Sequence, residues 1–212
     1  MAQTGGNGAG AARDFEWRPE DEASPDDMLA EAEALLLADS RSASAQFQRA
    51  YALFLLGRLP ECERELEDLC AANAGHANGW WLYAGVLRGR SGNRDPAVLN
   101  AFERAVAADA ANLYVQAEYA DVLRSLSRHQ EARAIYEGIL RPDACADDPL
   151  RCEAAFNLGI VLQVLGDTEA ALAAFQTALA LDPANADAAA MAELLTGGPA
   201  DASAPPKASS AP

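Results

Sequence analysis

The sequence has little positive charge. Its 212 residues include 32 Asp and Glu against 16 Lys and Arg, which gives a formal net charge of −16 at pH 7. Lys207 is the only lysine, so nearly every positive charge is an arginine. A chain this acidic repels phosphate groups, which makes nucleic acids and anionic membranes poor partners. The surplus of carboxylates indicates either an ordinary solvated surface or an acidic face that attracts a basic partner.

Residues that commonly bind metals are also few. The sequence has four cysteines, two histidines and no CxxC pair. Structural zinc sites usually have closely spaced Cys and His ligands, so we expect no metal and no other cofactor. The cysteines are interpreted as reduced thiols, some of them filling helix interfaces: Cys62, Cys70, Cys145 and Cys152.

Catalytic patterns are absent from the sequence. It contains no GxSxG motif and no phosphate-binding glycine loop that ends in GK. His76 and His129 fall in predicted loops, away from any positioned nucleophile. Pairs such as Asp147-Asp148 are interpreted as helix caps and solvated loops rather than as an acid and a base. We therefore expect that the protein is not an enzyme.

Long apolar runs are missing as well. No stretch approaches the roughly 20 apolar residues that a membrane-spanning helix needs. The first residues, MAQTGGNGAGAARDFEW, lack the basic start and apolar run of a secretory signal. We expect a cytoplasmic protein with no membrane insertion.

The two ends of the chain have no helical period. Residues 1–24 are rich in Gly, Ala, Asp and Glu and predict a disordered acidic arm. Phe15 and Trp17 interrupt this arm, either as a short linear motif, as residues that dock on the body of the protein, or with no special role. Residues 197–212 form a Gly, Ala, Pro and Ser tail that cannot bury a core.

Between these ends, apolar residues recur at helical spacing. About half of the residues are apolar, Ala is abundant, and Val and Ile are sparse, which is typical of an all-α protein. Residues 25–42 predict an N-terminal helix with Asp26 and Asp27 as capping candidates. Helix-sized blocks then alternate with short breaks, and small residues recur at intervals of 34, 36 and 39 residues: Ala50, Ala84, Ala120 and Gly159. A period near 34 with two helices per unit indicates stacked helical hairpins.

The last unit resembles a tetratricopeptide repeat (TPR). It reads AAFNLGIVLQVLGDTEAALAAFQTALALDPANA and matches that family's pattern at Leu158-Gly159, Leu162, Gly166, Ala171, Phe175, Ala178 and Pro183. Three earlier units match in part, at Ala50, Leu53 and Gly57, then at Trp80, Tyr83, Ala84, Leu87, Phe102 and Ala105, and then at Tyr119, Ala120, Leu123, Ala132 and Tyr136. The resemblance covers roughly residues 43–185.

The resemblance implies a right-handed superhelical array of about four hairpins with a concave groove. The expected bounds are 43–76, 77–111, 112–149 and 152–185, with residues 186–196 as a C-terminal capping helix. Small residues at the recurring positions let paired helices approach closely, while Trp80, Tyr136 and Phe175 fill the space between hairpins. Each hairpin alone leaves an apolar face bare, so the units must stack.

In this family the first helix of each hairpin lines the groove, which implies a set of partner-binding residues. The set is Phe47, Tyr51, Phe54, Asn78, Trp81, Arg88, Tyr114, Asp121, Arg124, Phe156, Ile160 and Gln163, with Glu153 beside them. Trp80 and Trp81 are adjacent on one helix and cannot face the same way, so we expect Trp80 in the core and Trp81 in the groove. Alternatively, some of these aromatic residues pack on neighbouring helices, and Arg88 and Arg124 belong to an ordinary solvated face.

A groove with several aromatic residues predicts a protein-binding scaffold that grips an extended or helical segment of another protein. One branch of the family clamps chaperone C-termini with basic groove residues, but the equivalent positions here lack that cluster: Phe47, Tyr51, Leu82, Tyr114 and Glu118. Two alternatives are a type III secretion chaperone that guards translocator proteins, which resembles this chain in size and acidity, and a permanent subunit of a larger complex. A homodimer is a further possibility, because a second copy can cover an apolar groove.

Overall fold

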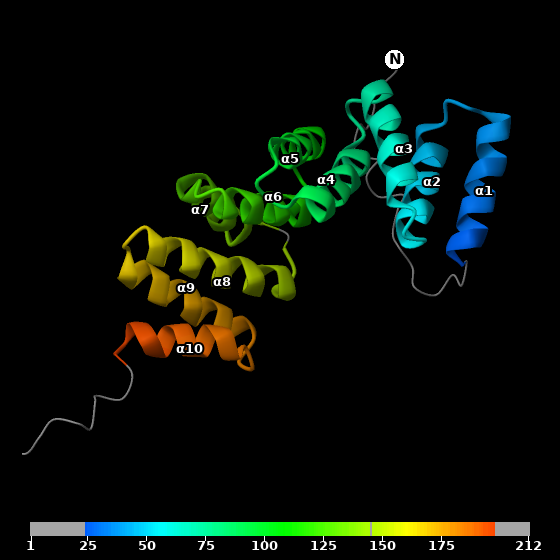
Figure 1. Ribbon diagram of the computed structural model, residues 1–212. Helices are drawn as coiled ribbons and strands as arrows, with labels where there is room; N and C mark the ends of the chain where they lie inside the picture. Colours follow the sequence, from blue (N-terminus) through cyan, green and yellow to red (C-terminus); the bar gives the residue numbers. More distant parts are fainter. Residues whose placement is uncertain (1–23, 145, 198–212) are drawn as a thin grey trace, which may run out of the picture. The chain divides into compact units, whose positions relative to one another are not determined.

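The computed structural model describes residues 24–144 and 146–197 (Figure 1). Within these ranges every regular element is an α-helix and there is no strand. The helices are α1 (Pro25–Ala38), α2 (Ala43–Leu55), α3 (Leu59–Ala72), α4 (Ala77–Ser91), α5 (Pro96–Ala108), α6 (Leu113–Ser125), α7 (His129–Ile139), α8 (Asp148–Val164), α9 (Thr168–Leu181) and α10 (Ala186–Leu195). The all-α fold expected from the sequence is confirmed.

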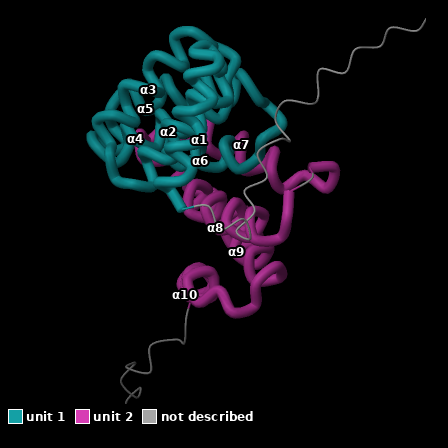
Figure 2. Tube along the Cα trace, turned by 90° about the vertical axis from the view of Figure 1, so that its right-hand side faces the viewer, with its two compact units in different colours: residues 1–122 teal, residues 123–212 magenta. Residues whose placement is uncertain are grey.

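The chain divides into two compact units (Figure 2). Unit 1 ends at Val122 and contains α1 to α5 and most of α6, whereas unit 2 begins at Leu123 and contains α7 to α10. Within unit 1, α1 packs on α2, α2 on α3, and α4 on α5. Within unit 2, α8 packs on α9 and α9 on α10. Consecutive helices therefore pair as hairpins in both units, with α1 preceding them and α10 following them.

Small residues at the recurring position allow the helices of a hairpin to approach closely. Ala50, Ala84 and Ala120 are fully buried. At Gly159 in α8 there is no room for a methyl group, because a Cβ would lie 2.5 Å from the Phe175 ring of α9. The ring of Phe175 and that of Tyr136 are fully buried, as expected. The small residues therefore lie where paired helices pack closely, as predicted, most clearly at Gly159.

Turns and caps fix where the helices begin and end. Gly57 and Gly166 follow first helices with φ of 71° and 84°, a left-handed conformation that glycine adopts without strain. Ser127 occupies the equivalent turn after α6 with φ of 61°. At the start of α1, Ser24 is the N-cap: its Oγ accepts the Asp27 backbone N–H at 3.2 Å, and the Asp27 carboxylate accepts the Ser24 backbone N–H at 3.3 Å. Of the two capping candidates, Asp27 therefore takes part in a capping box, while the N-cap position itself belongs to Ser24. Ser24 has the better geometry because Pro25 already occupies the first helical position.

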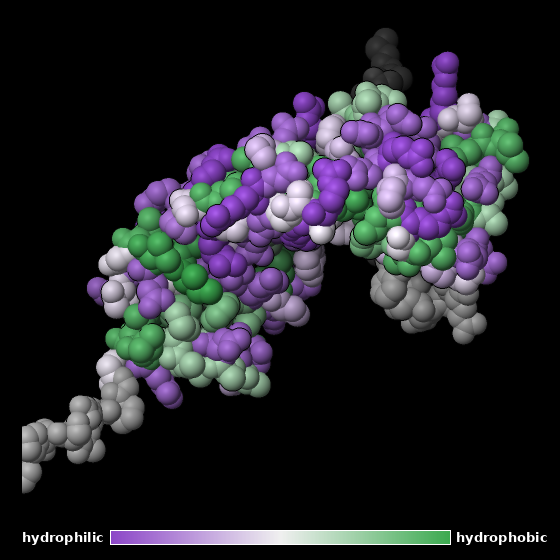
Figure 3. Space-filling model, viewed as in Figure 1, coloured by the Kyte–Doolittle hydropathy of each residue, from purple (hydrophilic) through white to green (hydrophobic). Residues whose placement is uncertain are grey.

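No helix in the described part of the chain is long and apolar enough to cross a membrane. Hydrophilic residues cover most of the face seen in Figure 3, and apolar residues form separate patches between them. Large apolar side chains with substantial exposure include Leu37, Tyr114, Val164 and Leu194. The apolar residues of the core are thus largely enclosed, and a limited set remains open to contact.

Candidate functional site

The residues predicted to line a groove lie on α2, α4, α6 and α8, the first helices of the hairpins. Those on α2, α4 and α6 up to Asp121 belong to unit 1, and those from Arg124 onward belong to unit 2. Asn78 is half-buried in the first turn of α4, and Ile160 and Gln163 are half-buried near the end of α8. The site of each unit is therefore built from its own helices.

Three aromatic rings form a ladder along one side of α2. Phe47 and Tyr51 have ring centroids 6.2 Å apart, and Tyr51 and Phe54 have centroids 6.5 Å apart, with interplanar angles of 18° and 21°. The ladder runs from the core to the surface, since Phe47 is 5% exposed and Phe54 is 38% exposed. Phe47 also packs at 5.3 Å against the ring of His76, which precedes α4. Phe47 thus forms the buried end of the ladder, and Phe54 forms its exposed end.

A polar network joins α4 to α6 within unit 1. The Trp81 indole Nε1 donates a hydrogen bond of 2.9 Å to Glu118 Oε1, and Arg88 Nη2 donates one of 2.7 Å to Glu118 Oε2. The Arg88 guanidinium also lies 5.4 Å from the centroid of the Phe102 ring. The Glu118 carboxylate therefore holds two side chains that were predicted to line the groove. Glu118 is also the ionic partner of Arg88.

Glu118 contacts two of the predicted partner-binding residues, although the sequence analysis named it only as a groove position that lacks the basic residue of the chaperone clamp. It lies one turn after Tyr114 and three residues before Asp121, so the three share a face of α6. Its pairing with Trp81 could not be foreseen, because the two residues are 37 positions apart in the sequence.

The adjacent tryptophans point to different sides of α4, as expected. Trp80 Nε1 donates to the Ala74 carbonyl at 2.9 Å, and the Arg104 guanidinium lies 5.0 Å from the centroid of its ring. The expectation that Trp80 is a core residue needs correction, because its side chain is only half-buried. It lines a cavity of about 720 Å³ between α3, α4 and α5, together with Tyr83. The polar indole edge keeps Trp80 near the surface, whereas Tyr136 and Phe175 are fully enclosed.

Histidine and cysteine have structural roles in unit 1. His76 is the N-cap of α4, and its Nδ1 accepts the Gly79 backbone N–H at 2.9 Å. Burial lowers the pKa of His76 below its usual value, so the ring is neutral and Nδ1 remains an acceptor near pH 7. Burial raises the pKa of the Cys62 and Cys70 thiols to about 12, so both stay protonated. In the described ranges, no group of three or more His, Cys, Asp or Glu side chains could hold a metal ion.

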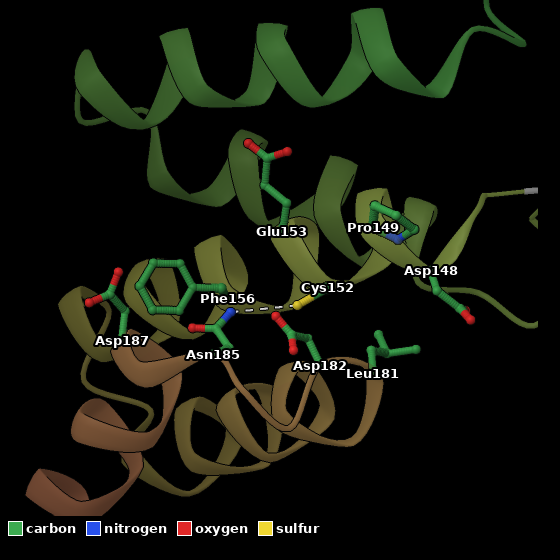
Figure 4. A pocket seen from close by; sticks show the side chains of 9 residues that line it. All are labelled: Asp148, Pro149, Cys152, Glu153, Phe156, Leu181, Asp182, Asn185 and Asp187. Atoms are coloured by element: carbon green, nitrogen blue, oxygen red, sulfur yellow. Dashed lines mark hydrogen bonds between the residues drawn. The ribbon is translucent and has the colours of Figure 1, made fainter.

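Unit 2 has a cavity of about 510 Å³ at the start of α8 (Figure 4). Glu153 and Phe156, both on the predicted face of α8, line it. The end of α9 and the turn between α9 and α10 supply the opposite wall, with Leu181, Asp182 and Asn185. The remaining lining residues are Asp148, Pro149, Cys152 and Asp187. The sequence analysis predicted Glu153 and Phe156 for the groove side of α8, but it did not bring the second wall to them.

Comparisons with known proteins agree with the hairpin architecture. The family model described as tetratricopeptide repeat matches residues 107–184. A search of curated proteins finds no match.

Among solved structures, MamA superposes with a TM-score of 0.62 at 16% identity, over 76% of this chain and 92% of MamA. YrrB, described as a tetratricopeptide protein with an unusual peptide-binding site, gives 0.63 at 18% identity, over 76% of this chain and 80% of YrrB. The pilF protein of Pseudomonas aeruginosa gives 0.59 at 18% identity, over 79% of this chain and 68% of that one. The expected resemblance to tetratricopeptide proteins is confirmed in sequence over residues 107–184 and in fold over about three quarters of the chain. Such proteins are in general non-enzymatic scaffolds that bind proteins or peptides.

Proposed function

We propose that this tetratricopeptide repeat chain is a non-enzymatic, cytoplasmic scaffold that holds a segment of another protein on the first-helix face of unit 1. The observation that carries the proposal is the series of aromatic side chains on α2, α4 and α6. It runs from the ladder of Phe47, Tyr51 and Phe54 through Trp81 to Tyr114.

Contacts between the helices support the continuity of this face. Phe47 on α2 packs against His76 at the start of α4, and Trp81 on α4 is bonded to Glu118 on α6. Tyr114 lies one helical turn before Glu118, on the same side of α6. Side-chain contacts therefore link α2 to the start of α4 and α4 to α6 within unit 1.

The exposure of these side chains supports binding. Tyr114 is 56% exposed and Phe54 is 38% exposed, although both rings are large. Aromatic anchors contribute strongly to protein interfaces when they become buried there, and they lose little conformational entropy. Trp81 is already oriented by its bond to Glu118, which lowers the cost of ordering it on binding. A partner segment with apolar anchors, extended or helical, fits this surface.

The test is affinity capture from a lysate of the source organism, with mass spectrometry of the retained proteins. The bait is the full chain as wild type, as the double variant Phe54→Ala/Tyr114→Ala, or as Tyr119→Ala. Tyr119 is a matched control because it is a tyrosine of the same helix whose hydroxyl instead donates to Glu103 of α5. We expect a partner that wild type and Tyr119→Ala retain and that the double variant loses, with equal helical content by circular dichroism.

Retention of the same partner by the double variant would contradict the proposal. If the chain captures itself, sedimentation at several concentrations will show a homodimer instead of a scaffold for another protein. Capture of a secreted protein with long apolar segments would favour the chaperone alternative.

A further inference from the structure

The cavity between α3, α4 and α5 of unit 1 lies on the side of α4 that carries Trp80. Its volume of about 720 Å³ is within the range of about 300–1,000 Å³ that is usual for ligand sites. The rings of Trp80 and Tyr83 line it, with centroids 6.2 Å apart and an interplanar angle of 53°. Small and apolar residues make up much of the remaining wall, among them Ala71, Ala74, Pro96 and Ala97. The cavity can therefore hold a large apolar side chain against two aromatic rings.

Arg104 of α5 is the only basic residue among those that line this cavity. Its guanidinium carbon lies 5.0 Å from the centroid of the Trp80 ring, and its Nε donates a hydrogen bond of 3.1 Å to Asn100 Oδ1. Within the described ranges Arg104 has no ion-pair partner, and its two terminal nitrogens make no hydrogen bond. An arginine oriented in this way can bond a carboxylate through two N–H groups while it stays on the ring. The cavity thus favours an apolar group with a carboxylate beside it.

The next hairpin shows that the fold does not need an aromatic ring at the position of Trp80. There, Gln116 Nε2 donates to the Ala110 carbonyl at 2.7 Å, in the same way as Trp80 Nε1 donates to the Ala74 carbonyl at 2.9 Å. A tyrosine–glutamate hydrogen bond of 3.2 Å accompanies each of these contacts. Since a glutamine side chain makes the framework hydrogen bond as well, the indole ring of Trp80 is available for a different role.

The arm that precedes α1 contains the only aromatic residues outside the described ranges, Phe15 and Trp17. They alternate with Asp14 and Glu16, so each ring has a carboxylate next to it in the sequence. Phe15 lies nine positions before Ser24, and an extended chain of nine residues spans up to about 30 Å. Axes of packed helices lie about 8–10 Å apart, so this length covers the two spacings from α1 through α2 to α3, which forms one wall of the cavity.

The charges of this segment complement those of the cavity. Asp14 and Glu16 are opposite in sign to Arg104. Arg18, directly after the segment, is opposite in sign to Glu67, the only acidic residue among those that line the cavity. Opposite charges at two points orient a docked segment and select it over an uncharged one.

We propose that residues 14–17 dock in this cavity of the same chain, with one aromatic ring against Trp80 and Tyr83 and one carboxylate on Arg104. Docking anchors the acidic arm on unit 1. The cavity belongs to the side of α4 that carries Trp80, whereas the proposed partner face carries Trp81. The inference is therefore independent of the proposed function, and the first-helix face stays open to a partner protein.

Photo-crosslinking of the full chain tests where the segment lies. p-Benzoyl-L-phenylalanine replaces Phe15, dilute protein is irradiated, and the linked peptides are identified by mass spectrometry. We expect links to cavity residues of α3 and α5, such as Ala71 and Ala97, in a product with the mass of one chain. Links mainly to Phe54 or Tyr114 would overturn the inference, as would a product with the mass of two chains or the absence of links to the cavity.

Substitutions on both sides of the contact test its chemistry. Trp80→Gln, which keeps the framework hydrogen bond, should lower the yield of cavity links by about threefold or more, because it removes the stacking surface. Arg104→Gln and the arm variant Asp14→Asn/Glu16→Gln should have effects of similar size, because each removes one side of the ion pair. Circular dichroism checks that the variants keep the helical content of wild type. Unchanged yields in all three would contradict the proposed contacts.

A matched control separates the segment from the general charge of the arm. The variant Glu20→Gln/Asp21→Asn removes two carboxylates of the same arm outside the segment. It should leave the yield of cavity links within about 1.5-fold of wild type, since charges outside the contact are screened by salt. Equal losses in this control and in Asp14→Asn/Glu16→Gln would overturn the inference.

A fluorescein-labelled peptide of residues 11–22 measures the affinity in solution. Its targets are wild type and the full-length variant Phe15→Ala/Trp17→Ala, whose own segment lacks both rings. We expect this variant to bind the peptide about tenfold or more tightly than wild type, because a tethered segment competes at an effective concentration in the millimolar range. Adding Arg104→Gln to the variant should remove most of this affinity. Equal affinities for wild type and the variant, including no binding by either, would overturn the inference.

Discussion

Unit 1 and unit 2 are built from the same kind of helical hairpin but differ in their ion pairs. In unit 1, the local pair of Arg58 with Glu61 is accompanied by ion pairs that connect separate helices, such as Arg49 with Glu65 at 2.6 Å, Arg88 with Glu118 at 2.7 Å, and Arg90 with Glu63. In unit 2, Arg133 pairs with Glu137 at 2.7 Å and Arg128 with Glu131 at 2.6 Å, each within about one helical turn. At the unit 2 cavity, Asp148 lies 3.6 Å from Arg151 of the same helix.

This contrast separates the repeat framework from the surface that it carries. The framework depends on small residues, buried rings and tight turns, which recur in both units. The surface depends on side chains that the framework leaves open, and these have diverged into an aromatic face in unit 1 and an acidic cavity in unit 2. Fold and binding chemistry are therefore set by different residues of the same helices.

The largest effect on the framework is expected at Gly159. Gly159→Ala should destabilise the protein by about 1–3 kcal/mol, because the new methyl group would lie 2.5 Å from the Phe175 ring. The matched change in unit 1 is Gly85→Ala in α4, where a Cβ meets nothing within 4 Å. That variant should gain about 0.5–1 kcal/mol from the helix propensity of alanine. Urea unfolding followed by circular dichroism measures both, and effects of the same sign would show that close packing does not distinguish the two sites.

A smaller effect is expected at the turns after the first helices. Ser127 adopts φ of 61°, a conformation that costs a residue with a Cβ more than it costs glycine. Ser127→Gly should therefore stabilise the protein by about 0.5–1 kcal/mol, and Gly57→Ser in unit 1 should destabilise it by a similar amount. Thermal unfolding of the two variants tests this pair. If Ser127→Gly is neutral or destabilising, a contact of the serine side chain must offset the strain.

The smallest effect should appear only in acid and only through unit 1. The pKa of His76 in the folded protein is lowered from 6.5 by burial, so the unfolded chain takes up a proton first as the pH falls. Its contribution to stability is fully present above pH 6.5 and is lost as the pH falls through the lower folded pKa. Protonation of Nδ1 would also remove the cap on Gly79.

The variant His76→Asn tests this sensitivity. Asparagine caps helices well and does not titrate, so this variant should lose less stability than wild type between pH 7 and pH 5. Urea midpoints at several pH values measure the difference. Parallel curves for the two proteins would mean that other groups account for the acid sensitivity.

Much of the fold was predictable from the sequence. Helical periodicity and the recurrence of small residues indicated the hairpins, and the role of Gly159 followed from its place in the pattern. The aromatic residues of the proposed binding face lie on first helices, as the resemblance to the repeat pattern implied, and their role in binding stays a prediction. The location of the Ser24 cap and the partial exposure of Trp80 were not predicted, since each depends on local geometry that residue spacing does not resolve.

The sequence by itself determined the helices, their pairing into hairpins and the acidic character of the protein, because these depend on local spacing and on composition. Only the tertiary structure decided which side chains meet. Glu118 reaches Trp81 and Arg88 from another hairpin, and the cavity of unit 2 joins Phe156 to Asp187 across the turn between α9 and α10. Such contacts join residues about 30 or more positions apart, and their geometry follows from how the helices stack rather than from the pattern along any one of them.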